Sequence, residues 1–67
     1  MIAVMVKELK QGDWFTLKPI EEPKESQVYI RREYDRSERK YFGEKFSDMS
    51  YGRYFKGDRV VYTDFIF

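Results

Sequence analysis

The residues best suited to bind a ligand gather between Tyr29 and Phe42. Aromatic and basic side chains alternate along this segment: Tyr29, Arg31, Arg32, Tyr34, Arg36, Arg39, Lys40, Tyr41 and Phe42. Aromatic faces stack nucleobases and basic groups meet phosphates, which is how small barrels hold single strands. If the chain binds nucleic acid, we expect the contacts to come from Tyr29, Arg31, Tyr34, Arg36, Arg39 and Tyr41. On this hypothesis Tyr29 and Arg31 face outward on one strand, with Tyr41 across from them.

The same segment has two other interpretations. Glu33, Asp35 and Glu38 lie among the basic residues and would weaken its attraction for phosphate. The charges then fit cross-strand pairs on a solvated face, where basic side chains also protect a sheet edge. Tyrosine and arginine equally suit a protein interface. All three interpretations stay open at this point.

Catalytic chemistry has little support in the sequence. The chain has no histidine and no cysteine, which removes the usual proton shuttle, the thiol nucleophile and the commonest transition-metal ligands. No glycine-rich phosphate loop and no calcium-loop pattern is present. The carboxylates fit solvated or turn positions. We therefore expect no enzyme, no metal, no cofactor and no small-molecule substrate.

Length and composition indicate one small domain spanning residues 1–67. The chain has 13 basic and 12 acidic residues, for a net charge of +1. The net charge therefore gives no indication of nucleic-acid binding. The apolar run from Met1 to Val6 is too short for a membrane span or a signal-peptide core. The absence of cysteine fits a reducing compartment, and we expect a cytoplasmic protein.

Aromatic content is the unusual feature of the composition. Six Tyr, six Phe and one Trp accompany a similar number of large aliphatic residues, more than a domain of this size can enclose. Some of these side chains must lie on the surface or be covered by another chain. This surplus favours a protein partner or self-association.

Strand signals dominate the chain, and no apolar helical pattern persists beyond two turns. Short β-rich runs separated by Gly, Pro and Asp predict five strands and no helix beyond one turn near 47–52. The runs cover 3–7, 14–18, 27–34, 39–46 and 59–67. Two prolines make 19–26 a loop.

The best-defined element is a hairpin in which 27–34 and 39–46 pair across a turn at 35–38. Asp35 and Ser37 are turn residues that bond the nearby backbone, and Gly43 predicts a bulge or a sharp bend. Val28 and Ile30 face one side of their strand. The expected core is Val4, Val6, Leu9, Phe15, Leu17, Val28, Ile30, Phe42, Phe46, Val61 and Phe65.

Together these elements predict an all-β fold, a small five-stranded antiparallel barrel of SH3-like type. The stretch Val6–Leu17, with Gly12–Asp13 before Trp14–Phe15, resembles the opening V-x-x-L-x-x-G-D-x-F of short proteins from phages and integrated mobile elements. Val28–Arg31, Tyr34–Ser37 and Lys56–Asp58 are similar to the same group. The resemblance implies a compact β-barrel and carries no catalytic residues.

The sequence therefore favours a small non-enzymatic binding module that mediates protein–protein or self-association. The alternative is an accessory protein that binds single-stranded nucleic acid with the 29–42 hairpin. Salt dependence separates the two, because phosphate-driven binding falls steeply with salt and apolar association does not.

Overall fold

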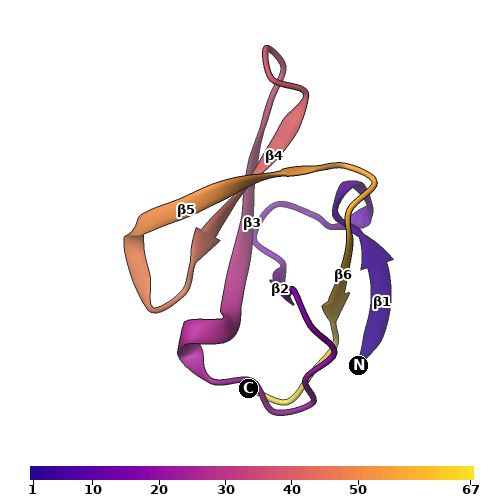
Figure 1. Ribbon diagram of the computed structural model, residues 1–67, viewed down its shortest axis with the longest axis vertical. Coiled ribbons are helices and arrows are strands. Elements are labelled where there is room, and N and C mark those ends of the chain that lie inside the picture. The colour runs from indigo at the N-terminus through magenta and orange to yellow at the C-terminus, as the bar shows by residue number, and fades with distance from the viewer.

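The computed structural model describes all residues 1–67 and contains one antiparallel sheet with no α-helix (Figure 1). Its six strands are β1 (Ile2–Met5), β2 (Trp14–Thr16), β3 (Val28–Asp35), β4 (Lys40–Lys45), β5 (Asp48–Lys56) and β6 (Val60–Thr63). Two 3₁₀ turns, η1 (Val6–Glu8) and η2 (Glu25–Gln27), interrupt the connections. None of the helical segments is long and apolar enough to cross a membrane.

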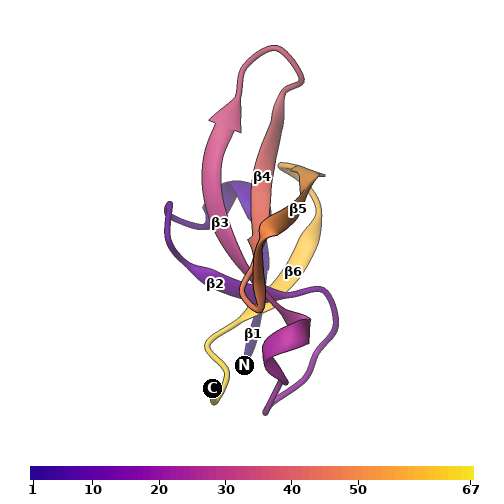
Figure 2. The same ribbon diagram turned by 90° about the vertical axis from the view of Figure 1, so that its left-hand side faces the viewer.

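The strand order is β1-β6-β2-β3-β4-β5, so β1 and β5 are the two edges. The chain is all-β as expected, but the sheet has six strands and does not close into a barrel. It curls so that the end of β5 reaches η1, where the Lys7 N–H donates to the Gly57 carbonyl at 3.0 Å. The β3–β4 hairpin projects away from the rest of the sheet (Figures 1 and 2).

The hairpin prediction is confirmed. β3 and β4 pair across a turn in which Asp35 Oδ1 accepts hydrogen bonds from the N–H groups of Ser37 and Glu38. The predicted bulge lies on the facing strand. Arg31 pairs with Gly43 and Tyr34 with Tyr41, so β3 carries one extra residue at 32–33. Such a bulge bends a strand and increases its twist.

Gly43 has a packing role instead. A Cβ at this position would lie 2.5 Å from Phe55 Cε2 and 3.1 Å from Phe15 Cζ. Real Cβ contacts are never that short, so only glycine lets the Phe55 ring rest on the β4 backbone. Phe55 is 2% exposed, and its ring centroid lies 5.4 Å from that of Phe15 and 5.6 Å from that of Tyr29.

The main core lies on the face of the sheet that these three rings occupy, the inner face. Its buried members are Val6, Leu9, Phe15, Tyr29, Phe55 and Val61, with Val4, Leu17 and Tyr41 packed against them. The opposite, outer face holds Val28 and Ile30, which are register partners of Thr16 and Trp14. There the rings of Trp14, Phe46 and Phe67 contact one another edge to face, with centroids 5.0–5.5 Å apart.

Six of the expected core residues are buried: Val6, Leu9, Phe15, Val28, Ile30 and Val61. Val4 and Leu17 are partly buried against the core, and Phe42, Phe46 and Phe65 are partly buried outside it. The prediction for Phe42 is wrong because Phe42 is the neighbour of Gly43 in β4 and therefore points to the opposite, outer face. Its ring packs there on Tyr54, with the ring centroids 5.2 Å apart. The core also contains Tyr29 and Phe55, which the sequence did not place there.

The single helical turn allowed near 47–52 does not form, because β5 begins at Asp48. The strand is irregular there. Glu44 pairs with Gly52 and Lys45 with Asp48, so Met49, Ser50 and Tyr51 loop out. The Ser50 hydroxyl and N–H both donate to Asp48 Oδ1, at 2.6 and 3.1 Å, and these bonds lower the pKa of the Asp48 carboxyl. These hydrogen bonds within residues 48–50 compensate for the β4–β5 backbone hydrogen bonds that the looped-out residues do not make.

The contact between Gly43 and Phe55 predicts a specific loss of stability. Gly43→Ala should lower the free energy of unfolding by about 1–3 kcal/mol, because the new methyl group displaces a buried ring. Combined with Phe55→Leu, the effect should fall short of the sum of the single variants by more than about 0.5 kcal/mol. Urea denaturation followed by Trp14 fluorescence measures all three. Additive losses would show that the two residues do not meet.

A second prediction concerns the outer face. Ile30→Ala should cost about 2–5 kcal/mol, since Ile30 is 8% exposed between Trp14 and Glu44. Val60→Ala is the matched control, because Val60 is 50% exposed and should change stability by less than about 0.5 kcal/mol. If Ile30→Ala is as mild as the control, Ile30 is not a core residue.

Candidate binding surfaces

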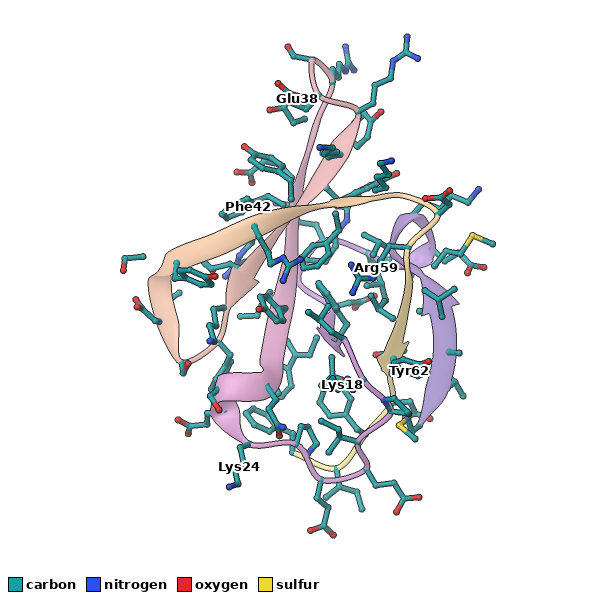
Figure 3. All side chains as sticks on the ribbon, viewed as in Figure 1. Lys18, Lys24, Glu38, Phe42, Arg59 and Tyr62 are labelled. Carbon is teal, nitrogen blue, oxygen red and sulfur yellow. The ribbon has the colours of Figure 1, made fainter.

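The six residues predicted to bind nucleic acid separate into three groups. Arg31, Tyr34 and Tyr41 come together on the inner face of the hairpin. Tyr29 is 8% exposed inside the core, so its expected outward orientation is wrong: Arg31 shares its face, but the Phe15 and Phe55 rings cover Tyr29. Arg36 and Arg39 lie exposed in the turn at the hairpin tip, beside Glu38 (Figure 3).

Stacked arginines extend this group across β5. The Arg31 guanidinium carbon lies 4.5 Å from the Tyr41 ring centroid, and those of Arg53 and Arg59 lie 5.1 and 5.8 Å from that of Phe55. Tyr34 packs on Tyr41 at 4.7 Å. We call Arg31, Tyr34, Tyr41, Arg53, Phe55 and Arg59 the arginine–aromatic face. Each cation is held by the negative face of a ring.

None of these three guanidinium groups has a carboxylate partner. The one ion pair of the chain joins Arg32 and Glu44 at 2.8 Å, on the opposite face of the hairpin. Arg31 Nε is buried and makes no hydrogen bond. Of the acids expected to weaken the segment, Asp35 accepts hydrogen bonds within the turn, and Glu33 and Glu38 form no ion pair. The face therefore keeps its positive charge.

A basic hollow adjoins this face at the β5 edge. It has a volume of about 290 Å³ and is lined by Lys40, Tyr54, Phe55, Lys56, Asp58 and Arg59. Lys40 and Lys56 are register partners on adjacent strands, a like-charged pair that destabilises a sheet unless an anion screens it. Asp58 is the one carboxylate in the lining. Three cations and one anion leave the hollow with two excess positive charges.

The missed residues of these surfaces come from β5 and the turn after it. The sequence predicted no strand over 47–58 and placed Arg59 at the start of the last strand. Nothing therefore placed Arg53, Phe55 and Arg59 beside Tyr41. Tyr51, Tyr54 and Phe55 give this segment strand-forming residues, but Arg53-Tyr54-Phe55-Lys56 does not alternate between apolar and polar side chains. Gly52 weakened the signal further, because glycine is also typical of a turn.

The opposite edge of the sheet is uncharged. β1 reads Ile2-Ala3-Val4-Met5 and pairs on one side only, with β6. Ile2 is 53% and Met5 37% exposed, and Val60, the register partner of Met5, is 50% exposed. Natural sheets protect such edges with charge, proline or bulges. β1 has none of these within its bounds.

The backbone of β1 shows which of its groups are free. The Val6 N–H donates to the Arg59 carbonyl at 3.0 Å, toward β6, so by strand alternation the N–H groups of Ala3 and Met5 point away from β6. Glu8 Oε1 accepts the Met5 N–H at 2.7 Å. The unpaired part of the edge is therefore centred on Ala3 and ends at the Glu8 carboxylate.

Comparison of the chain with protein-family models, curated proteins and solved structures gives no significant match. No three His, Cys, Asp or Glu side chains lie together in a way that could hold a metal ion.

The stacked arginines should contribute to stability as a cover over Phe55. Arg53→Ala and Arg59→Ala should each lower the free energy of unfolding by about 0.5–1 kcal/mol, the value of an exposed cation–π contact. Arg36→Ala at the hairpin tip is the matched control and should change it by less than about 0.5 kcal/mol. Urea titration gives the three values, and losses no larger than the control's would remove the covering role.

Proposed function

We propose that this chain is a small, non-enzymatic cytoplasmic binding module that associates with protein through the free edge of β1. The observation that carries the proposal is an uncharged edge strand with exposed apolar side chains. An extended segment of another chain can add to such an edge through main-chain hydrogen bonds. The surplus of apolar residues supports this use, since Met1, Ile2, Met5 and Val60 remain on the surface around the edge.

A second copy of the chain is the partner that fits best. Met1-Ile2-Ala3-Val4-Met5 is nearly symmetric about Ala3. Antiparallel pairing of two copies about that residue places Ala3 opposite Ala3, Ile2 opposite Val4, and Met1 opposite Met5. Every position then meets an apolar one, and the Ala3 N–H and carbonyl groups pair with those of the other copy. Such an interface is two-fold symmetric and closes on itself.

Glu8 limits the length of this interface. Its carboxylate already accepts the Met5 N–H, so this N–H cannot also donate to the Met1 carbonyl of the other copy without breaking that bond. The paired segment is short, and the buried area falls in the range of weak, transient association. The proposed module therefore exchanges between monomer and dimer and does not form an obligate oligomer.

The symmetry about Ala3 gives a direct test by charge reversal. Ala3→Lys places two like charges directly opposite each other in the dimer, and so does Ala3→Glu. We expect each variant alone to be monomeric by sedimentation equilibrium at concentrations where the native chain dimerises. An equimolar mixture of the two should dimerise again, because opposite charges then meet.

Ser50→Lys, at the looped-out part of the β5 edge, is the matched control and should dimerise like the native chain. Two results would contradict the proposal. One is a native chain that stays monomeric at millimolar concentration. The other is dimerisation that Ala3→Lys leaves unchanged.

A further inference from the structure

We propose that the basic hollow beside the arginine–aromatic face binds single-stranded nucleic acid, with a phosphate between Lys40, Lys56 and Arg59 and a base stacked on Tyr54. This site lies at the β5 edge, away from the β1 edge used for self-association. Lys40, Tyr54 and Lys56 line it from the outer face and Phe55 from the inner face, so the hollow lies at the strand edge itself, with Arg59 inside the arc formed by β5 and β6 (Figure 3). The two proposals stand independently.

Charge is the first support for an anionic ligand. Lys40 and Lys56 face each other across β4 and β5, and neither makes an ion pair, since the chain's one ion pair is Arg32–Glu44. Holding two like charges opposite each other costs free energy. A phosphate between them would turn that repulsion into attraction. The Asp58 carboxylate in the same lining is the one group that opposes the ligand.

Arg59 supplies the second support. Its guanidinium group stacks on the Phe55 ring at 5.8 Å and makes no ion pair. Stacking fixes the plane of this guanidinium group, and because Arg59 is exposed its donors remain open to solvent. A guanidinium plane held in this way can bind a phosphate oxygen or stack on a base.

An exposed aromatic ring in the same lining favours nucleic acid over other anions. Tyr54 is 48% exposed and lines the hollow together with the three cations. Its ring packs on Phe42 at 5.2 Å, which orients it and leaves much of its surface free. A ring beside a phosphate site suits a single strand, whose bases are unpaired and can stack. An acidic peptide would use the cations and leave this ring uncovered.

The test is a fluorescence-anisotropy titration of a labelled 12-nucleotide single strand, in DNA and RNA versions, at about 50 mM salt. We expect the native chain to bind and to lose affinity steeply as salt rises. Tyr54→Ala should weaken binding about tenfold, the loss of one stacked base. Lys40→Gln and Lys56→Gln should each weaken it and reduce the salt slope by about one.

Two controls separate binding from folding. Lys24→Gln makes the same charge change at the far end of the molecule (Figure 3) and should leave affinity nearly unchanged. Lys56→Gln removes one member of a repelling pair, so its melting temperature should equal or exceed that of the native chain while its affinity falls. A merely structural role for Lys56 would move the two quantities together.

Three results would overturn the proposal. The first is no binding of either strand at 50 mM salt with the protein at about 100 μM. The second is an equal loss of affinity in Lys24→Gln and Lys56→Gln, which would indicate non-specific attraction. The third is displacement of the oligonucleotide by polyglutamate at equal charge concentration with no effect of Tyr54→Ala, which would make the hollow a general anion site.

Discussion

The packing of the Phe55 ring on the backbone of Gly43 is the constraint on which the rest of the structure depends. A Cβ at residue 43 would come within 2.5 Å of that ring, so the Phe55 ring can fold over the β4 backbone only because the position is glycine. The contact brings β5 over the core and puts Phe55 against Phe15 and Tyr29. In a single open sheet this cluster replaces the second layer that a sandwich would supply.

The open sheet leaves two edges, and they differ in chemistry. At β5 the core is covered by arginine side chains, whose stems pack on apolar surface while the charged ends remain in water. This cover collects positive charge beside Lys40 and Lys56, where no carboxylate forms an ion pair. At β1 the edge is apolar and ends at the Glu8 carboxylate. Both proposed binding activities use an edge strand, and the sheet has two edge strands because it does not close into a barrel.

The hairpin turn and the aliphatic core positions of β3 could be predicted from the sequence. The hairpin, its Asp35 turn and the burial of Val28 and Ile30 follow from alternation and turn chemistry. Tyr29 could not be placed, because β3 is buried on both faces at its start and period 2 no longer separates inside from outside. Phe55 and β5 were not predicted, because Gly52 favoured a turn in this segment. Of the arginine–aromatic face, Arg31, Tyr34 and Tyr41 were found, whereas the hollow was missed because only the pairing of β4 with β5 brings Lys56 opposite Lys40.

The most direct test of this account is the nuclear Overhauser effect between the α-protons of Gly43 and the ring protons of Phe55, measured on the native chain in solution. The structure predicts strong cross-peaks between them, together with cross-peaks from the Phe55 ring to Phe15 and Tyr29. Their disappearance in Phe55→Leu would confirm the assignment. A native spectrum in which Gly43 shows no contact with any aromatic ring would contradict the account at its central point.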